Sequence, residues 1–367
     1  MKFTCRRSDL LDAVNIVERA VAAKSTMNIL EGIYIEAKAD AIRFLGNNLE
    51  LCIDCIIPGD VTEKGNCVVK ANLFSDAVKK LPTYVDDVHI EVSDANAILL
   101  SCGNANFNFS TASGDEFPRP PEIIAKNEIK IKEQTLKNTI RQTLYAVAMN
   151  DIKPFLTGLL FDIKDHLINV VGCDGYRLAI RREPTEHDGT FRFILQGKTA
   201  RELLTLLGDS DYEVEIRVSD KQAQMKLKNC TVTTRLIDGD YLSYEDVARH
   251  ENTLFVVTDT KEILDSVDRA ALIASESIKG HVLLHIEDGQ VYINCETLLG
   301  QVQDKFDVEM KGEPIEIAFN PRYLLDAFKN VDCKEIRLTF STDLNPVVIQ
   351  PTEGESFRYI VLPVRLH

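Results

Sequence analysis

The chain has 367 residues, of which 45% are hydrophobic and 27% charged, and its formal net charge is −15. This length predicts two or three domains. The acidic total excludes a broad basic surface for nucleic acid, although it leaves room for a local one. No apolar run approaches the roughly 18 to 20 residues that span a bilayer. Nine cysteines lack disulfide-framework spacing, and the N-terminus has no apolar signal segment, so we expect a reducing cytosol.

The first third of the chain alternates helix-like and strand-like patterns. Apolar residues recur at helical spacing in residues 8–24 and again in ANLFSDAVKKLP, from Ala71, which predicts two amphipathic helices. Between them, GIYIEAKADAIRFLGNNLELCID, from Gly32, alternates apolar and polar positions in three short runs, which predicts three strands. A hairpin is predicted from Ile90, and the proline-rich stretch FPRPPEI at residues 117–123 predicts a linker.

The second third repeats this order of elements. A helical pattern begins at Glu133, and GLLFDIKDHLINVVGCDGYRLAI, from Gly158, reads as strand, turn, strand, break and strand. A second helix is predicted from Gly197 and a hairpin from Ile216. The segment DGDYL at residues 238–242 occupies the place that GDEFP occupies in the first third. We therefore interpret both segments as structural turns rather than carboxylate pairs.

The last third repeats the order once more. A helix is predicted from Thr260, strands from His281 in HVLLHIEDGQVYINCETLLGQVQ, a helix from Asn320 and a hairpin from Leu338. Ser8 and Thr260 are predicted to be the N-caps of their helices, because their hydroxyls can accept from free helical N–H groups.

Successive copies lie about 120 to 127 residues apart, which is within the usual size range of a domain. We therefore predict three α+β domains over residues 1–123, 124–251 and 252–367. Each should hold two helices and about eight short strands. The boundaries are expected near residues 118–127 and 250–253.

One segment of the middle copy, CDGYRLA at residues 173–179, differs from its counterparts. Gly175, Tyr176 and Arg177 align with Leu-Glu-Leu at residues 49–51 and with Thr-Leu-Leu at residues 297–299. The shared fold therefore does not require Gly-Tyr-Arg, and a function particular to the middle copy is one explanation. A turn that has simply diverged is another, because glycine in turns is routine.

The order of helices and strands, the triplication, the start MKFT and the ending VLPVRL together resemble the bacterial DNA polymerase III beta subunit, the sliding clamp. The resemblance covers the whole chain. It implies three tandem copies of the DNA-clamp fold, each with two helices packed on antiparallel sheets. It also implies a head-to-tail dimeric ring that encircles double-stranded DNA and gives processivity in DNA replication, with no catalytic residues.

The resemblance further implies a pocket for short linear peptides of the replicative polymerase, the clamp loader and repair proteins. Such a pocket needs apolar walls and a few polar groups. The residues that align with it are Leu156, Cys173, Gly175, Tyr176, Arg177, Leu178, Leu242, Val247, Ile360, Leu362, Pro363, Val364 and Arg365. Tyr176 stands where the family commonly has histidine, Leu242 where it has proline, and Asp246 where well-known members have arginine, so the peptide preference is expected to differ.

The resemblance places two other surfaces. Lys24, Lys153 and Lys198 align with basic positions that face DNA, although a charged residue on a helix is usually only solvated. The dimer interface aligns with Phe107 and Phe109 on one side and with Leu272 and Ile273 on the other. The alternative for these four residues is an ordinary core position.

Other chemistry has weaker support. Cys52 and Cys55 form a CxxC, but no second pair has zinc-site spacing and the motif lies in a predicted strand. No metal and no cofactor is expected, since a P-loop and GxGxxG are both absent. Two alternatives to the clamp remain: an enzyme that uses Cys173 as a nucleophile with a distant histidine, and a monomeric peptide-binding scaffold.

Overall fold

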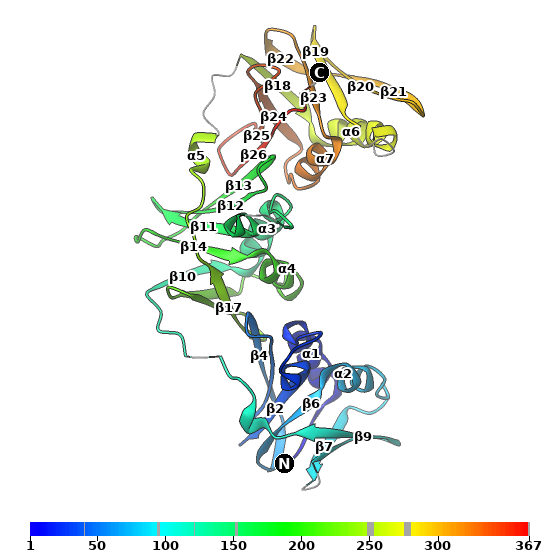
Figure 1. Ribbon diagram of the computed structural model, residues 1–367, viewed down its shortest axis with the longest axis vertical. Coiled ribbons are helices and arrows are strands. Elements are labelled where there is room, and N and C mark those ends of the chain that lie inside the picture. The colour runs from blue at the N-terminus through cyan, green and yellow to red at the C-terminus, as the bar shows by residue number, and fades with distance from the viewer. Residues whose placement is uncertain are drawn as a thin grey trace. The chain divides into compact units, whose positions relative to one another are not determined.

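The computed structural model describes residues 1–39, 41–93, 96–120, 122–150, 153–247, 253–274 and 280–365 (Figure 1). The chain divides into two compact units. The first holds residues 1–134 and 205–236, and the second holds residues 135–204 and 237–367. The predicted boundary at residues 250–253 lies almost entirely outside the described residues, as does Pro121 of the predicted linker.

The first unit is built on two antiparallel groups of strands. One group runs in the order β5 (Asp60–Glu63), β1 (Lys2–Arg6), β7 (Asp87–Ser93), β8 (Ala97–Cys102), β9 (Ala105–Ala112). The other runs in the order β6 (Gly65–Lys70), β2 (Gly32–Lys38), β3 (Ala41–Asn47), β4 (Leu51–Pro58), β17 (Thr231–Ile237), β16 (Gln222–Lys226), β15 (Glu213–Val218), β10 (Asn127–Lys132). Helices α1 (Arg7–Val17) and α2 (Ala71–Lys79) lie side by side, and α1 also packs on β3 and β4 (Figure 1).

The second unit holds one long antiparallel sheet and one of four strands. The long sheet runs β14 (Phe191–Gln196), β11 (Gly158–Lys164), β12 (Leu167–Cys173), β13 (Arg177–Pro184), β26 (Phe357–Val361), β25 (Val347–Pro351), β24 (Glu335–Phe340), β18 (Leu254–Asp259), β22 (Glu309–Gly312). The other runs β21 (Gly300–Asp307), β20 (Gln290–Thr297), β19 (Val282–Glu287), β23 (Ile315–Phe319). The remaining helices are α3 (Glu133–Leu144), α4 (Gly197–Leu206), α5 (Tyr244–Val247), α6 (Thr260–Ala274) and α7 (Pro321–Lys329).

Helix α6 shows how the periodic pattern builds the core of the second unit. Its buried residues Ile263, Val267, Ala270 and Ala274 recur at helical spacing. This face contacts α7 and the four-stranded sheet at β20 and β21. Each fully buried aliphatic side chain stabilises the fold by about 1.5 to 3 kcal/mol relative to an exposed one.

The predicted order of helices and strands is confirmed in all three repeats, but both predicted N-caps are wrong. Helix α1 already begins at Arg7, directly after β1, and Ser8 Oγ donates to Asp9 Oδ1 instead. At α6 the cap is Asp259, whose Oδ1 accepts from the N–H groups of residues 261 and 262 at 2.9 and 3.1 Å. Thr260 Oγ1 donates to the carbonyl of Cys333. In both repeats the strand runs directly into the helix, so the last strand residue occupies the cap position.

Candidate functional site

The segment CDGYRLA forms the tight turn between β12 and β13. Asp174 organises this turn, because its Oδ1 accepts from the backbone N–H groups of Tyr176 and Arg177, both at 2.9 Å. Gly175 has φ +88°, a conformation that favours glycine, and a Cβ there would meet nothing within 4 Å. This backbone conformation favours glycine, and the open space around Gly175 leaves the turn accessible.

Arg177 is held inside the fold rather than extended into solvent. Its Nε donates to Asp174 Oδ2 at 3.0 Å, and its Nη1 donates to Asp326 Oδ2, on α7, at 2.5 Å. The guanidinium lies 4.7 Å from the ring centre of Tyr323 and 5.4 Å from that of Tyr145. Burial lowers the pKa of Arg177, but the two carboxylates outweigh it and the pKa is raised overall.

The C-terminal strand is attached to this turn. β26 pairs with β13 in the register Arg177↔Val361, and Leu362 N–H donates to the carbonyl of Tyr176 at 2.9 Å. Further along, Val364 N–H donates to the carbonyl of Ala318. Backbone hydrogen bonds on both sides of Pro363 therefore fix the tail beside the CDGYRLA turn.

Apart from Arg177, the aligned pocket residues fall into two groups. A buried cluster contains Leu156, Cys173, Leu178, Ile360 and, half-buried, Leu242. The others lie at the surface: Tyr176 is 61% exposed and Val247, Leu362 and Val364 are each 38% exposed; Gly175 and Arg365 are exposed, and Pro363 is half-buried. The exposed group can reach a ligand directly, whereas the buried group supports it. Direct contact by the buried residues stays a prediction.

Several residues of this site were not identified from the sequence. Tyr241 and Tyr244 belong to the same buried cluster, and Tyr244 Oη donates to Asp162 Oδ2 at 2.7 Å. Asp326 and Tyr323 come from α7, far along the chain. Only Asp174 had a local signal, because Asp before Gly is typical of a turn.

The three departures from the family pattern occupy different environments. Tyr176 stacks on Tyr323 with ring centres 6.0 Å apart. Leu242 packs half-buried against the cluster. Asp246 is exposed on the short helix α5, which the sequence patterns do not predict. The tyrosine and the leucine therefore shape the apolar surface, while the aspartate changes the charge beside it.

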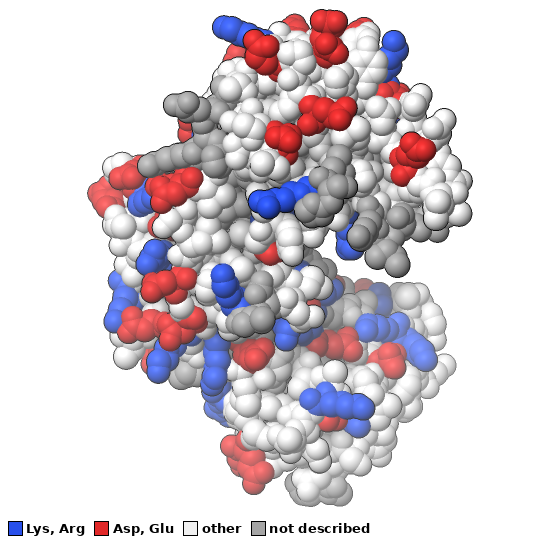
Figure 2. Space-filling model, turned by 45° about the horizontal axis from the view of Figure 1, so that its top comes forward, with Lys and Arg blue, Asp and Glu red and all other residues white. Residues whose placement is uncertain are grey.

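The basic residues on the helices are mixed with acids. Lys198 lies on α4, whereas Lys24 and Lys153 lie outside the helices, and all three are exposed. Other helix cations are paired with carboxylates: Lys79 with Glu18 at 3.1 Å, Arg141 with Asp332 at 2.5 Å, Lys329 with Asp268 at 3.9 Å, and Arg269 with Asp304. Figure 2 shows both signs of charge interspersed on the face in view. Any attraction for phosphate is therefore local and weak.

The four aligned interface residues are at least partly accessible. Phe107 and Phe109 are half-buried on β9, and their rings stack 6.1 Å apart. Leu272, on α6, is 70% exposed, so the core alternative is wrong for this residue, and Ile273 is half-buried. The tip between β20 and β21 adds two exposed leucines that the sequence alone did not indicate, Leu298 and Leu299.

The cysteines of the CxxC are buried in β4. Cys55 Sγ donates to the carbonyl of Asn229, and burial raises the pKa of both thiols to about 12. Cys173 is also buried, and its Sγ accepts from the N–H of Gly175 at 3.3 Å. Within the described ranges, no cluster of metal-ligating side chains and no helix long and apolar enough to cross a membrane is present.

Comparisons with known proteins cover the entire chain. Family models for the N-terminal, central and C-terminal domains of the DNA polymerase III beta subunit match residues 1–121, 130–242 and 248–365. The chain is 32% identical to the beta sliding clamp of Bacillus subtilis and 31% identical to that of Halalkalibacterium halodurans, with all of each chain covered. Solved structures over the full length of both chains include a putative DNA polymerase III beta subunit from Eubacterium rectale (34% identity, TM-score 0.95). They also include the sliding clamp of Bacillus subtilis (31% identity, TM-score 0.96). The α+β class and the three tandem copies of the clamp fold are thereby confirmed, and the chain belongs to the DNA polymerase III beta subunit family, the bacterial beta sliding clamps.

Proposed function

We propose that two copies of this chain close head to tail into a ring around double-stranded DNA and tether the replicative polymerase in the cytoplasm. The full-length match to beta sliding clamps carries this proposal. The family acts as a non-catalytic processivity factor, which agrees with the buried setting of Cys173. We also propose the clamp domains 1–123, 124–251 and 252–367.

The two ends of the proposed interface are unlike, as ring closure between identical copies requires. In the first unit, residues 105–110 of β9 pair with β8. Among the described residues of β9, only 111 and 112 pair with β6. In the second unit β21 is the edge of its sheet. Beside these edges lie half-buried Phe107 and exposed Leu272. Each edge offers free backbone groups and apolar side chains to the other.

A ring linked topologically to DNA does not need a strongly basic surface to stay on it. Phosphate contacts dominate non-specific affinity for DNA and fall steeply with salt. A clamp that must slide cannot hold tightly, and the net charge of −15 suits a surface that does not adhere to DNA. We propose that Lys24, Lys153 and Lys198 face the duplex, since all three are exposed.

The test of the ring is retention on circular DNA. We expect the loaded chain to remain on a nicked circle at a salt concentration that abolishes its binding to short linear duplex. Linearising the circle should release it within the time needed to slide to an end. Gel filtration after cutting measures this release, and loss that ignores DNA ends would contradict the ring.

We propose that the CDGYRLA turn and the C-terminal tail take linear peptides of the polymerase, the clamp loader and repair proteins. Leu362→Ala should weaken binding of a fluorescent peptide containing glutamine, leucine and a terminal phenylalanine about fivefold, because about 1 kcal/mol of apolar contact is lost. Anisotropy measures the affinity. Leu99→Ala is the matched control, since Leu99 is 40% exposed and Leu362 is 38% exposed. Equal affinities for the two variants would remove Leu362 from the site.

A further inference from the structure

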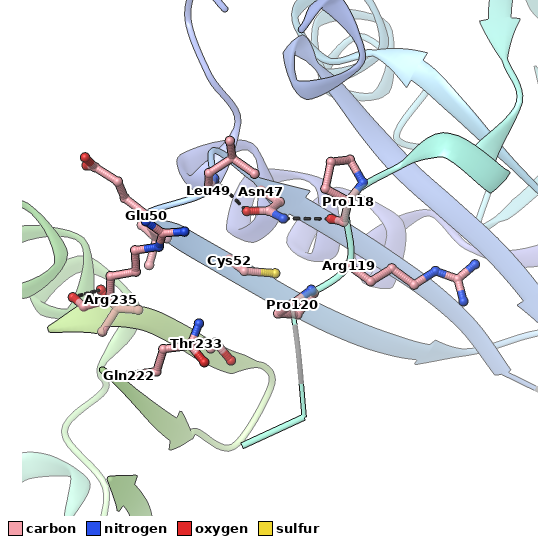
Figure 3. Close-up of a pocket in the computed structure, with 12 residues that line it drawn as sticks. Asn47, Leu49, Glu50, Cys52, Pro118, Arg119, Pro120, Gln222, Thr233 and Arg235 are labelled. Carbon is pink, nitrogen blue, oxygen red and sulfur yellow. Dashed lines mark hydrogen bonds between the residues drawn. The ribbon is translucent and has the colours of Figure 1, made fainter. Parts of the chain in front are cut away.

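A cavity lies within the first unit, where β4 meets β17 (Figure 3). Its volume is about 240 Å³. Leu51 and Cys52 contribute buried apolar surface, Pro118 and Pro120 stand on one side, and Gln222 lies on the other. None of these residues belongs to the peptide site proposed above.

The turn at this cavity repeats the bonds by which the side chain of residue 174 organises the CDGYRLA turn. Asn48 Oδ1 accepts from the N–H groups of Glu50 and Leu51 at 3.1 and 2.8 Å, as Asp174 does for the residues at 176 and 177. Leu49 has φ +73°, where the other turn has its glycine at φ +88°. The same local geometry is therefore built from Asn-Leu-Glu-Leu in place of Asp-Gly-Tyr-Arg.

The strand that closes the cavity is attached in the same way. β17 pairs with β4 in the register Leu51↔Thr234, and Arg235 N–H donates to the carbonyl of Glu50 at 2.9 Å. In the second unit β26 pairs with β13, and Leu362 N–H donates to the carbonyl of Tyr176, also at 2.9 Å. Turn and closing strand are thus repeated together.

The third wall is repeated as well. The segment GDEFP ends at Pro118, and its counterpart DGDYL ends at Leu242, which packs on the buried cluster of the peptide site. Here Asn47 Nδ2 donates to the carbonyl of Pro118 at 2.7 Å and holds the linker against the turn. Three separate segments therefore reassemble the framework of the peptide site inside the first unit.

The replaced side chains determine what the cavity can hold. Leu51 stands where Arg177 stands in the other turn, so this part of the wall is apolar, while Glu50, Arg119 and Arg235 bring charge to the rest of the lining. Within the described chain, no hydrogen bond engages the side-chain amide of Gln222 at the edge. Drug-sized ligands occupy pockets of about 300 to 1,000 Å³, so about 240 Å³ suits one or two side chains instead.

We propose that this cavity is a second binding site for a short linear peptide of a partner protein. It seats one anchor the size of leucine or phenylalanine, and Gln222 hydrogen-bonds the peptide beside that anchor. The choice of a peptide rests on the proposed function of the repeat-equivalent site. The cavity itself does not.

Tryptophan reporters at repeat-equivalent positions separate the two sites, because the chain contains no tryptophan. Glu50→Trp reports on the cavity and Tyr176→Trp on the peptide site, and both native side chains are exposed. The probe is a hexapeptide with glutamine, leucine and a terminal phenylalanine, and its control has both apolar anchors replaced by alanine. We expect saturable emission changes with the probe alone in both reporters. Adding Gln222→Ala should weaken binding at Glu50→Trp about fivefold, the effect of one hydrogen bond, while Leu362→Ala should leave it unchanged.

Other combinations of responses from the two reporters distinguish this inference from the proposed function. A response of Tyr176→Trp alone overturns this inference and leaves the proposed function standing. Silence of both reporters overturns both, and a response of Glu50→Trp alone supports the cavity and contradicts the proposed peptide site. A Glu50→Trp signal that Leu362→Ala abolishes belongs to the other site and overturns the inference.

A second readout avoids substitutions in the cavity. A photoreactive phenylalanine analogue at the anchor position of the probe is irradiated with the native chain and mapped by mass spectrometry. Crosslinks to residues 47–52 or 118–120 are expected alongside those in the second unit. Crosslinks confined to the second unit overturn the proposal even if a tryptophan reporter responds.

Discussion

Leu272→Asp should convert the chain from a dimer to a monomer. The native side chain is 70% exposed in the single chain, so the substitution should change the free energy of unfolding by less than about 0.5 kcal/mol. In the ring the same side chain would be buried against the partner. Loss of its apolar contact costs about 2 kcal/mol, and burial of an unpaired carboxylate costs several kcal/mol more.

Together these costs should raise the dimer dissociation constant by on the order of a thousandfold or more. Both interfaces of the ring carry the change, because a two-membered head-to-tail ring uses the same pair of surfaces twice. Sedimentation velocity measures the mass, and the circular-DNA experiment should show that retention disappears with it.

Ile124→Asp is the matched control. Ile124 is 86% exposed directly after the linker, so this variant introduces the same charge at an apolar surface position and should stay dimeric. Leu272→Asp remaining dimeric at micromolar concentration would place the interface elsewhere and favour a different pairing of the edges of β9 and β21.

The repeated fold was predictable because each element carries a strong local pattern. Strands such as β11 and β12 alternate or run apolar between turn residues, and α6 keeps one face apolar throughout. The N-caps were not predictable from residue type alone. Ser8 is an ordinary capping residue, but the chain enters α1 at Arg7 because β1 ends one residue earlier.

The candidate site was predictable in position but not in chemistry. Aspartate, glycine and a following strand identify the turn at residues 173–177. Nothing near Arg177 in the sequence reveals Asp326, which lies 149 positions away and reaches it only through the packing of α7. The cavity beside Leu51 was missed for a related reason: the aligned letters differ, while the backbone bonds that they make are the same.

Arg177→Ala should lower the free energy of unfolding of the second unit by about 3 kcal/mol. The arginine side chain is 11% exposed, and its two carboxylate partners are 15% and 33% exposed. Removing one member of such a buried pair typically costs 3 to 5 kcal/mol, because charges are left without a partner. We take the lower end, since Asp326 retains some water. The midpoint of denaturation, followed by hydrogen exchange in β13 and α7, measures the loss.

Arg182→Ala is the control for this effect. Arg182 is 18% exposed, close to Arg177, but its partner Glu355 is 70% exposed. An ion pair with one solvated member contributes about 0 to 1 kcal/mol. The difference in the free energy of unfolding between the two variants therefore measures the cost of leaving the partially buried carboxylates of Asp174 and Asp326 unpaired.

Peptide affinity decides what Arg177 does in the site. If the arginine acts by holding the turn, Arg177→Ala should weaken the peptide only as far as Tyr176 loses its place against Tyr323. Adding Asp326→Asn to Arg177→Ala should then restore part of the stability, because one unpaired charge is removed. If instead Arg177→Ala is as stable as Arg182→Ala and abolishes peptide binding, the guanidinium leaves its two carboxylates and bonds the peptide directly. The first outcome makes Arg177 a positioning residue, and the geometry favours it, since both carboxylates and both tyrosine rings already engage the guanidinium.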